Sequence, residues 1–331
     1  FFYLVKQQNV YSLIMKPPGG AKFANIHYDN GILGTLEFRS IMGIATMCFL
    51  LFLFKALFRP TKKALKKDKF TEFKLIGKKN ISHDTIRITF ANPLGKDAIL
   101  GLPIGQHITF KFTDDEGKEI LRSYTPVTGD ERPGDVTFVI KVYKKGVHPK
   151  FPDGGKMSQY VDSLKVGDNM LMRGPKGSLD YKGQGKFDII KPRKPLDSRK
   201  ATSFGMIAGG TGLTPMLQVI SAVLRDEHDS TTTLHLLLAN QTEGDILCRE
   251  QLEKLEKDFP TRFFVNYTLD RPPKGWKGHS GFITKEMIDD CLPTAAEGVQ
   301  VLMCGPPPMI KFACLPNLEK CGFKQNQLYT F

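Results

Sequence analysis

The chain has 331 residues, of which 41% are hydrophobic and 24% are charged, a composition typical of a globular protein long enough for two domains. Its formal net charge of +13 predicts a negatively charged partner, either nucleic acid, an anionic membrane or an acidic protein. The basic residues come without a helix-turn-helix, zinc-finger or aromatic RNA-binding pattern, so we expect no nucleic-acid partner. The six cysteines show no CxxC pair and no metal-ligand spacing, which predicts free thiols and no metal site.

The N-terminal part contains one long apolar segment. Residues 1–40 mix apolar runs with prolines and glycines, and their sequence indicates no fold. Residues 41–58 carry a single charge, Lys55, and as a helix they would cover about 27 Å, close to the hydrocarbon thickness of a membrane. Arg59 and two lysines follow, which favours a membrane anchor over a buried helix or a cleaved signal peptide. We expect residues 59–69 to form an exposed basic tether, with the body in the cytosol at the endoplasmic reticulum or the mitochondrial outer membrane.

Residues 70–181 carry the pattern of short β-strands. Apolar and polar residues alternate within each segment, and turn residues such as Pro93-Leu94-Gly95 separate the segments. This spacing predicts a small antiparallel β-barrel. The predicted strands lie at residues 73–76, 86–90, 107–112, 120–124, 136–143 and 169–173.

Two motifs in this region suit a cofactor that carries phosphate and an aromatic ring. Arg122 and Tyr124 lie two residues apart on a predicted strand, so a phosphate-binding guanidinium and a flat ring share one face. Gly154-Gly155-Lys156 indicates a glycine turn that opens a helix, where backbone N–H groups and the lysine suit an anion. The alternatives are ordinary strand-surface chemistry and an ordinary helix start with a solvated lysine.

After a predicted linker at residues 182–201, rich in Lys, Pro and Arg, the pattern changes. From residue 202 to 331 short apolar strands alternate with helical segments, which predicts a parallel sheet with its ligand at the carboxyl ends of the strands. The predicted strands are 204–208, 234–239, 263–269 and 300–304, and the predicted helices are 216–225, 250–257, 285–290 and 309–320.

A glycine loop, Gly209-Gly210-Thr211-Gly212, follows the first of these strands. We expect Thr214 to cap the next helix and Pro215 to occupy its first position. The loop departs from the dinucleotide fingerprint, because Pro215 replaces the third glycine and no acid follows about twenty residues on. Its place between a strand and a helix nevertheless favours a role in letting the backbone approach a ring or a phosphate.

Two further strand ends are candidates. Asp270 ends the third strand, where a carboxylate would bind a ribose diol and repel a 2′-phosphate, selecting NADH over NADPH; the alternative is a solvated turn residue. Cys304 ends the fourth strand and is followed by Gly305 and three prolines. It has no general base nearby in sequence, so it is either a small buried residue or a residue beside the cofactor.

Together these motifs resemble the ferredoxin-reductase-like flavoproteins, most closely the members of that family that reduce cytochrome b5 with NADH. The resemblance implies an antiparallel β-barrel that binds FAD, followed by an α/β domain with a parallel sheet that binds NADH. It runs from about residue 70 to residue 331, on segments 101–107, 122–126, 139–143, 148–151, 154–159, 209–215, 240–243 and 304–309.

The resemblance also implies roles for individual residues. For FAD, the matching positions are Arg122, Ser123, Tyr124, Thr125, Val139, Lys141, Lys156, Met157, Ser158 and Thr214. For NADH, they are Lys141, Gly209, Gly210, Thr211, Gly212, Thr214, Asp270, Cys304 and Gly305, with Phe331 as the aromatic C-terminal residue. The residues implied to take part in catalysis are Thr125 and His107 near the reactive flavin nitrogen, Lys141, and Cys304 near the nicotinamide.

The implied activity is that of a monomeric, membrane-anchored enzyme. NADH would give a hydride to FAD, and single electrons would pass on to cytochrome b5, an acidic heme protein suited to a basic surface. One alternative is a reductase of the same superfamily with another one-electron acceptor, such as a nitrate-reductase-type module. A second alternative, from another class, is a membrane-tethered binding protein without catalytic activity on the same scaffold.

Overall fold

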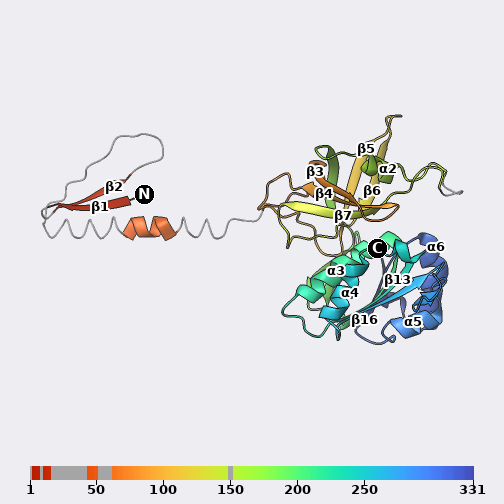
Figure 1. Cartoon of the computed structure of the whole chain (residues 1–331). Coiled ribbons are helices and arrows are strands. Elements are labelled where there is room, and N and C mark those ends of the chain that lie inside the picture. Colours follow the sequence, from red (N-terminus) through yellow and green to blue (C-terminus); the bar gives the residue numbers. More distant parts are fainter. Residues whose placement is uncertain (1, 8–9, 16–42, 51–61, 148–151) are drawn as a thin grey trace. The chain divides into compact units, whose positions relative to one another are not determined.

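The computed structural model describes residues 2–7, 10–15, 43–50, 62–147 and 152–331, and the chain divides into two units, 1–60 and 61–331. In the first unit, β1 (Phe2–Gln7) pairs antiparallel with β2 (Val10–Met15), and residues 43–50 are helical (Figure 1). The sequence did not predict this hairpin. Among the described residues, no helix has the length and apolar character needed to cross a membrane. Residues 51–58 of the predicted anchor lie outside the described part.

The second unit begins with a lobe built on one antiparallel sheet, which we call the antiparallel lobe (residues 62–181). All six strands were predicted from the sequence, and they join in the order β6-β5-β8-β3-β4-β7. Phe90, Phe110 and Phe138 are fully buried inside it and pack edge to face. The ring centroids of Phe110 and Phe138 are 4.9 Å apart. The elements are β3 (Thr71–Asn80), β4 (Thr85–Ala91), β5 (His107–Thr113), β6 (Glu119–Tyr124), β7 (Asp135–Lys141), α2 (Lys156–Ser163) and β8 (Asn169–Lys176).

The segment expected as an exposed tether is instead attached to this lobe. The backbone N–H groups of Ala64 and Leu65 donate to the carbonyls of Ile99 and Leu100, and both side chains are buried. Burying a leucine side chain contributes about 1.5–3 kcal/mol, which explains why this apolar pair leaves solvent although lysines flank it. The prediction of an exposed segment is therefore wrong for Ala64 and Leu65, whereas Lys62, Lys63 and Lys66 are exposed as expected.

The segment predicted as a linker, residues 182–201, contains regular structure. A three-stranded antiparallel sheet is formed by β9 (Leu179–Gly183), β10 (Lys186–Ile189) and β11 (Asp197–Lys200). Phe187 and Ile189 are buried on one face of β10. The surrounding lysines, arginines and prolines obscured this short alternation in the sequence.

The remainder forms a lobe on one parallel sheet, which we call the parallel lobe (residues 202–331). Its strand order is β15-β14-β13-β12-β16-β17, and every neighbouring pair is parallel, as predicted. The short edge strands β15 and β17 were not predicted. The strands are β12 (Ser203–Gly209), β13 (Thr233–Asn240), β14 (Phe263–Leu269), β15 (His279–Ser280), β16 (Val299–Cys304) and β17 (Leu328–Thr330).

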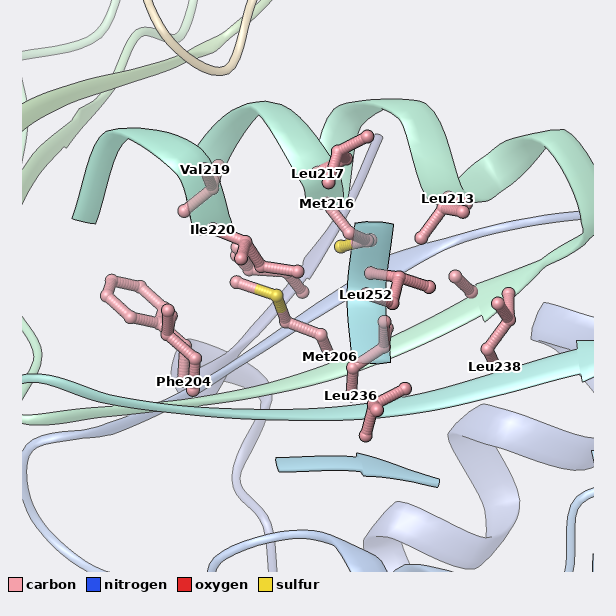
Figure 2. Packing of buried hydrophobic residues seen from close by; sticks show 14 of the residues in the cluster. Phe204, Met206, Leu213, Met216, Leu217, Val219, Ile220, Leu236, Leu238 and Leu252 are labelled. Carbon is pink, nitrogen blue, oxygen red and sulfur yellow. The ribbon is translucent and has the colours of Figure 1, made fainter. Parts of the chain in front are cut away.

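Helices cover this sheet. Figure 2 shows the apolar face of α3, with Leu213, Met216 and Ile220, above Met206 and Leu236 of the central strands. The helical elements are η1 (Gly210–Gly212), α3 (Leu213–Arg225), η2 (Glu243–Asp245), α4 (Arg249–Asp258), α5 (Lys285–Cys291), α6 (Pro307–Met309), η3 (Ile310–Cys314), α7 (Leu315–Lys320) and η4 (Gln325–Gln327).

Three predicted helix details are wrong, and one is the place of Pro215, which is the third residue of α3 and not the first. The N-cap of α3 is Gly212 and not Thr214, because the 3₁₀ turn η1 leads directly into the helix. Thr214 lies inside the first turn and donates its hydroxyl to the carbonyl of Thr211 at 3.1 Å. The helix predicted at residues 309–320 is divided by a π-helical turn, η3, just before Pro316, whose missing N–H removes one bond of the regular helix.

Candidate cofactor-binding site

The start of α2 offers backbone donors to an anion. Gly155 is the N-cap and has no side chain to bond the first-turn N–H groups, which also lack partners within the helix. Gly154 adopts φ +66°, and a Cβ there would lie 2.3 Å from the carbonyl oxygen of Tyr143. Helix α2 packs against β6, the strand that carries Arg122. Uncapped N–H groups on a helix and an exposed guanidinium on the strand against which it packs are donors that suit a pyrophosphate.

The predicted residues of α2 are used differently from one another. The Lys156 ammonium lies 2.8 Å from the Asp114 carboxylate, and this hydrogen bond raises the pKa of Lys156. The Ser158 hydroxyl accepts from the Tyr143 N–H and donates to the Gly155 carbonyl. The Met157 side chain is buried in the core of the lobe. Met157 and Ser158 therefore offer a cofactor mainly their backbone N–H groups.

Strand β6 places Tyr124 and its neighbours. Tyr124 pairs with Ile108, and its ring lies 4.8 Å from that of Phe110. Burial raises the pKa of Tyr124 to about 12, although nearby Arg122 opposes the shift, so the phenol is neutral near pH 7. Arg122 and Ser123 are exposed on the same strand.

His107 and Thr125 both adjoin the last residue pair between β5 and β6. The β5–β6 register ends at Ile108 and Tyr124, and His107 and Thr125, both half-buried, are the next residues along their segments. Burial, together with the charge of Lys176, lowers the pKa of His107. A neutral imidazole and a hydroxyl at adjacent positions can donate and accept hydrogen bonds without carrying charge.

In the parallel lobe the glycine loop and the end of β16 are in direct contact. A Cβ on Gly212 would lie 2.1 Å from the carbonyl oxygen of Cys304, and a Cβ on Gly305 would lie 3.2 Å from the backbone nitrogen of Gly209. Gly210 differs from these two residues, because it adopts φ +54° and a Cβ there would meet no protein atom within 4 Å. The absence of side chains at Gly212 and Gly305 thus lets the glycine loop and the end of β16 pack closely, whereas the space beside Gly210 is open.

The C-terminal residue closes the same region. The Phe331 N–H donates to the carbonyl of Met303 at 2.9 Å, which sets Phe331 beside the strand that ends at Cys304. Burial raises the pKa of the Cys304 thiol to about 11, so the thiol stays protonated at neutral pH. Cys304 therefore lacks the thiolate character of a nucleophile.

Asp270 is exposed at the carboxyl end of β14, two strands away from β12. Its N–H donates to the Asn240 carbonyl, which fixes the strand end. The neighbouring Arg271 donates to the Gln241 side chain at 3.0 Å. Partial burial raises the pKa of Asp270, with Arg271 opposing.

Lys141 lies where the two lobes meet. Strand β7 contacts η1, which brings Lys141 and the buried Val139 toward the glycine loop. The Lys141 ammonium lies 2.7 Å from Asp84 and 3.1 Å from Asp245. Burial disfavours its charge, but the two hydrogen bonds outweigh that effect and raise the pKa of Lys141.

The sequence reasoning missed Asp84, Asp245 and Gln218. The Gln218 side chain accepts from the Gly105 N–H at 2.7 Å and joins α3 to the antiparallel lobe. A glutamine in the apolar run of α3 was a signal that could have been followed.

The arrangement forms three groups of the predicted residues. Arg122, Ser123 and Tyr124 share β6, against which α2 packs. Gly209–Gly212, Cys304, Gly305 and Phe331 meet at the carboxyl ends of β12 and β16, and β7 carries Val139 and Lys141 to that edge. Lys156 is engaged by Asp114 instead of standing free.

Each lobe matches a known domain family. Residues 72–181 match an oxidoreductase FAD-binding domain, and residues 206–315 match an oxidoreductase NAD-binding domain. NADH-cytochrome b5 reductase 1 of Homo sapiens is 52% identical over 259 residues, covering 78% of this chain and 84% of that protein. NADH-cytochrome b5 reductase 2 of Xenopus tropicalis is 48% identical over 311 residues, covering 92% of this chain and 99% of that protein.

The chain belongs to the NADH-cytochrome b5 reductase family. Among solved structures, the cytochrome b5 reductase domain of Ulva prolifera nitrate reductase has a TM-score of 0.76 at 42% identity, covering 81% of this chain and all of that chain. The CS-b5R domains of human Ncb5or have a TM-score of 0.61 at 26% identity, covering 79% of this chain and 69% of that chain. The sequence-based resemblance to this family is confirmed.

Proposed function

We propose that this chain is an FAD-dependent NADH-cytochrome b5 reductase, which takes a hydride from NADH and passes single electrons to cytochrome b5. The observation that carries the proposal is the pair of domain matches, FAD-binding and NAD-binding, together with about 50% identity to reductases of that name over most of the chain. The contact between the glycine loop and the strand end at Cys304 supports the proposal, because it brings together the residues that we assign to NADH.

For FAD, we assign the phosphates to Arg122 and to the first-turn N–H groups of Lys156, Met157 and Ser158. The Tyr124 ring would lie against the flavin ring system, with Ser123, Val139 and Thr214 as further contacts. The neutral states of Tyr124 and His107 follow from their shifted pKa values. Together with Thr125 they can orient the ring by hydrogen bonds without adding charge.

For NADH, we assign the nicotinamide end to the loop Gly209–Gly212, with Thr214, Cys304 and Gly305 around it and Phe331 beside it. Gly210 leaves space for close approach of a ring or a phosphate. Asp270 would bind the adenosine ribose and disfavour a 2′-phosphate. Lys141 lies between both sets and is held by its two carboxylates.

When bound, FAD accepts a hydride and releases electrons one at a time, which is the cofactor's own chemistry. The task of this chain is to hold nicotinamide and flavin in contact and to keep water away. The protonated Cys304 thiol would be a small, uncharged group beside the nicotinamide.

A bleaching experiment tests the function. Purified full-length protein should be yellow, and its flavin absorbance should bleach when NADH is added without oxygen. A colourless protein, or a yellow protein that NADH does not bleach, would contradict the proposal and favour a non-catalytic binding protein.

The acceptor is tested separately. We propose that the basic surface steers cytochrome b5, so its reduction should slow as ionic strength rises. The Ulva prolifera relative belongs to a nitrate reductase, which makes a different acceptor the main alternative. Rapid bleaching by NADH combined with slow reduction of cytochrome b5 would favour that alternative.

We also propose that residues 41–58 anchor the protein to the endoplasmic reticulum or the mitochondrial outer membrane, with a monomeric body in the cytosol. The apolar sequence supports this, as do the exposed side chains of Ile44, Met47, Phe49 and Leu50 in the described helical turns. Alkaline carbonate washing of cell membranes should leave the full chain in the pellet and release a variant that begins at residue 62. Release of both forms would contradict the anchor.

A further inference from the structure

Among the described residues, two ion pairs formed by a lysine or an arginine connect the lobes, and they differ in their surroundings. Lys141 of β7 pairs with Asp245 of η2 at 3.1 Å, and the side chains are 24% and 8% exposed. Arg225 of α3 pairs with Glu131 at 2.6 Å, and those side chains are 55% and 42% exposed. An exposed ion pair contributes little to stability, whereas the partners of a largely buried one are costly to separate. The first pair is therefore the stronger tie.

The position of each pair separates their roles. Asp245 lies in the turn after β13, at the carboxyl edge of the parallel sheet, and β7 contacts η1 at the same edge. Arg225 is the last residue of α3, about 20 Å along the helix from the glycine loop. Of these two pairs, the buried one is the pair that ties the lobes together where we place the two cofactors.

The two carboxylates that hold Lys141 are arranged alike. In Asp245, Oδ2 accepts from the N–H and hydroxyl of Thr242, and Oδ1 accepts from Lys141. In Asp84, Oδ1 accepts from Thr85, and Oδ2 pairs with Lys141. Each carboxylate uses one oxygen to hold its own turn and the other to hold the ammonium.

The Lys141 ammonium is thus fixed from both lobes. The pKa values of Asp84 and Asp245 are both lowered, because their hydrogen bonds, including those to Lys141, outweigh the effect of burial. His83 lies on the exposed side of this group, 3.4 Å from Asp84 and 3.9 Å from Asp245. These three residues bring possible metal ligands within 4.8 Å of one another, but Lys141 already supplies the cation.

We propose that Asp245 is a positioning residue, which ties the parallel lobe to the antiparallel lobe through Lys141 and so sets the approach of nicotinamide to flavin. This inference rests on the proposed function, because the approach concerns hydride transfer. A displacement of about 1 Å between reacting groups can cost about 100-fold in rate. Lys141 then acts on the reaction through the placement of the lobes, because its two carboxylates come from different lobes.

The test compares Asp245→Asn with two controls in the full chain. Asp245→Asn keeps the shape of the side chain and one oxygen for Thr242, but it removes the charge that faces Lys141. Asp84→Asn removes the equivalent pair inside the antiparallel lobe, and Arg225→Gln removes the exposed pair between the lobes. Asp245→Glu restores the charge and should return values to those of the wild type.

Amide hydrogen exchange measures how firmly the two lobes are held together, and it does not depend on enzyme activity. The Gly105 N–H donates to Gln218 across the interface, so its exchange reports separation of the lobes. We expect exchange about fivefold faster or more in Asp245→Asn, and less than about twofold faster in both controls. Equal acceleration in Asp245→Asn and Arg225→Gln would overturn the proposal.

Single-turnover reduction of the bound flavin supplies the second readout. In Asp245→Asn the limiting rate at saturating NADH should fall about tenfold, while the Kd for NADH should change less than about threefold. A raised Kd with an unchanged limiting rate would show that Asp245 acts in binding, and would overturn the proposal. If Asp245→Asn does not fold, Lys141→Gln tests the same tie by hydrogen exchange.

The two kinds of failure can be told apart. A wild-type protein that NADH does not bleach would contradict the proposed function, and the exchange comparison would still decide the role of Asp245. A wild type that bleaches, beside an Asp245→Asn variant that matches it in exchange and limiting rate, would contradict only the further inference.

Discussion

Helices α2 and α3 each begin after a glycine-rich turn, and the two turns differ in what surrounds their glycines. Before α2, Gly154 lies against the backbone of Tyr143, and the following N–H groups are left uncapped. Before α3, Gly212 lies against the backbone of Cys304, while Gly210 opens onto free space. The first turn is built to offer donors, whereas the second lets two chain segments pack together beside an open surface.

The largest expected effect is that of Gly212→Ala. A Cβ at Gly212 would lie 2.1 Å from the Cys304 carbonyl oxygen, so the glycine loop and the end of β16 must separate. The rate of flavin reduction by NADH should fall about 100-fold, because the nicotinamide position moves. The matched control is Gly244→Ala, where a Cβ meets no atom within 4 Å. Similar rates in both variants would show that this contact does not shape the site.

Gly154→Ala should act on the other cofactor. Its Cβ would lie 2.3 Å from the Tyr143 carbonyl oxygen, so the start of α2 must shift. The N–H groups of its first turn would then no longer point at the FAD phosphates. We expect the Kd for FAD to rise about tenfold, measured by equilibrium dialysis of the flavin. Gly146→Ala is the control, because that glycine also has a positive φ, +77°, but has open space around it. An equal rise in the Kd for FAD in both variants would show that backbone strain alone causes the effect.

Asp270→Ala should change selectivity between nucleotides. Removing the carboxylate removes the repulsion of a 2′-phosphate, so the ratio of kcat/KM for NADPH to that for NADH should rise about tenfold. Steady-state kinetics with both nucleotides measure this ratio. Glu250→Ala, an exposed acid in α4, is the control for a general loss of negative charge. An unchanged ratio in Asp270→Ala would remove Asp270 from the selectivity argument.

The smallest expected effect is a pH dependence of stability. Because the folded pKa values of Asp84 and Asp245 lie below the ordinary value of 3.8, the pairs with Lys141 stabilise the fold above that value and are lost as pH falls through the lowered values. The difference in Tm between wild type and Asp245→Asn should be constant from about pH 5 to pH 8 and should shrink below about pH 4. A difference that changes between pH 7 and pH 5 would contradict the assignment of the effect to the two aspartates.

The sequence predicted the strands more reliably than the contacts. All six strands of the antiparallel lobe and the four central strands of the parallel sheet were found, because their apolar alternation or apolar runs are long enough to read. Residues 62–66 and 186–189 were missed as ordered structure, because only two apolar side chains in each segment are buried among many basic residues. Such short signals gain their energy from a neighbour that lies far away in the sequence.

The sequence offered candidate residues for the site, but it did not show which contacts each of them makes in the fold. Lys156 and Lys141 were both expected to face a cofactor, and each is paired with an aspartate that lies far away in the sequence. Asp245 could not be chosen from the sequence alone, because its partner Lys141 lies 104 residues away. Long-range pairs of this kind depend on the packing of the two lobes, which local patterns do not contain.

The most direct test of the account is the electron balance between NADH and cytochrome b5. A limiting amount of NADH is added without oxygen to the full-length protein with excess oxidised cytochrome b5. Because a hydride carries two electrons and the heme takes one, the account predicts two cytochromes reduced for each NADH consumed. Consumption of NADH with no reduced cytochrome, or no consumption at all, would contradict it.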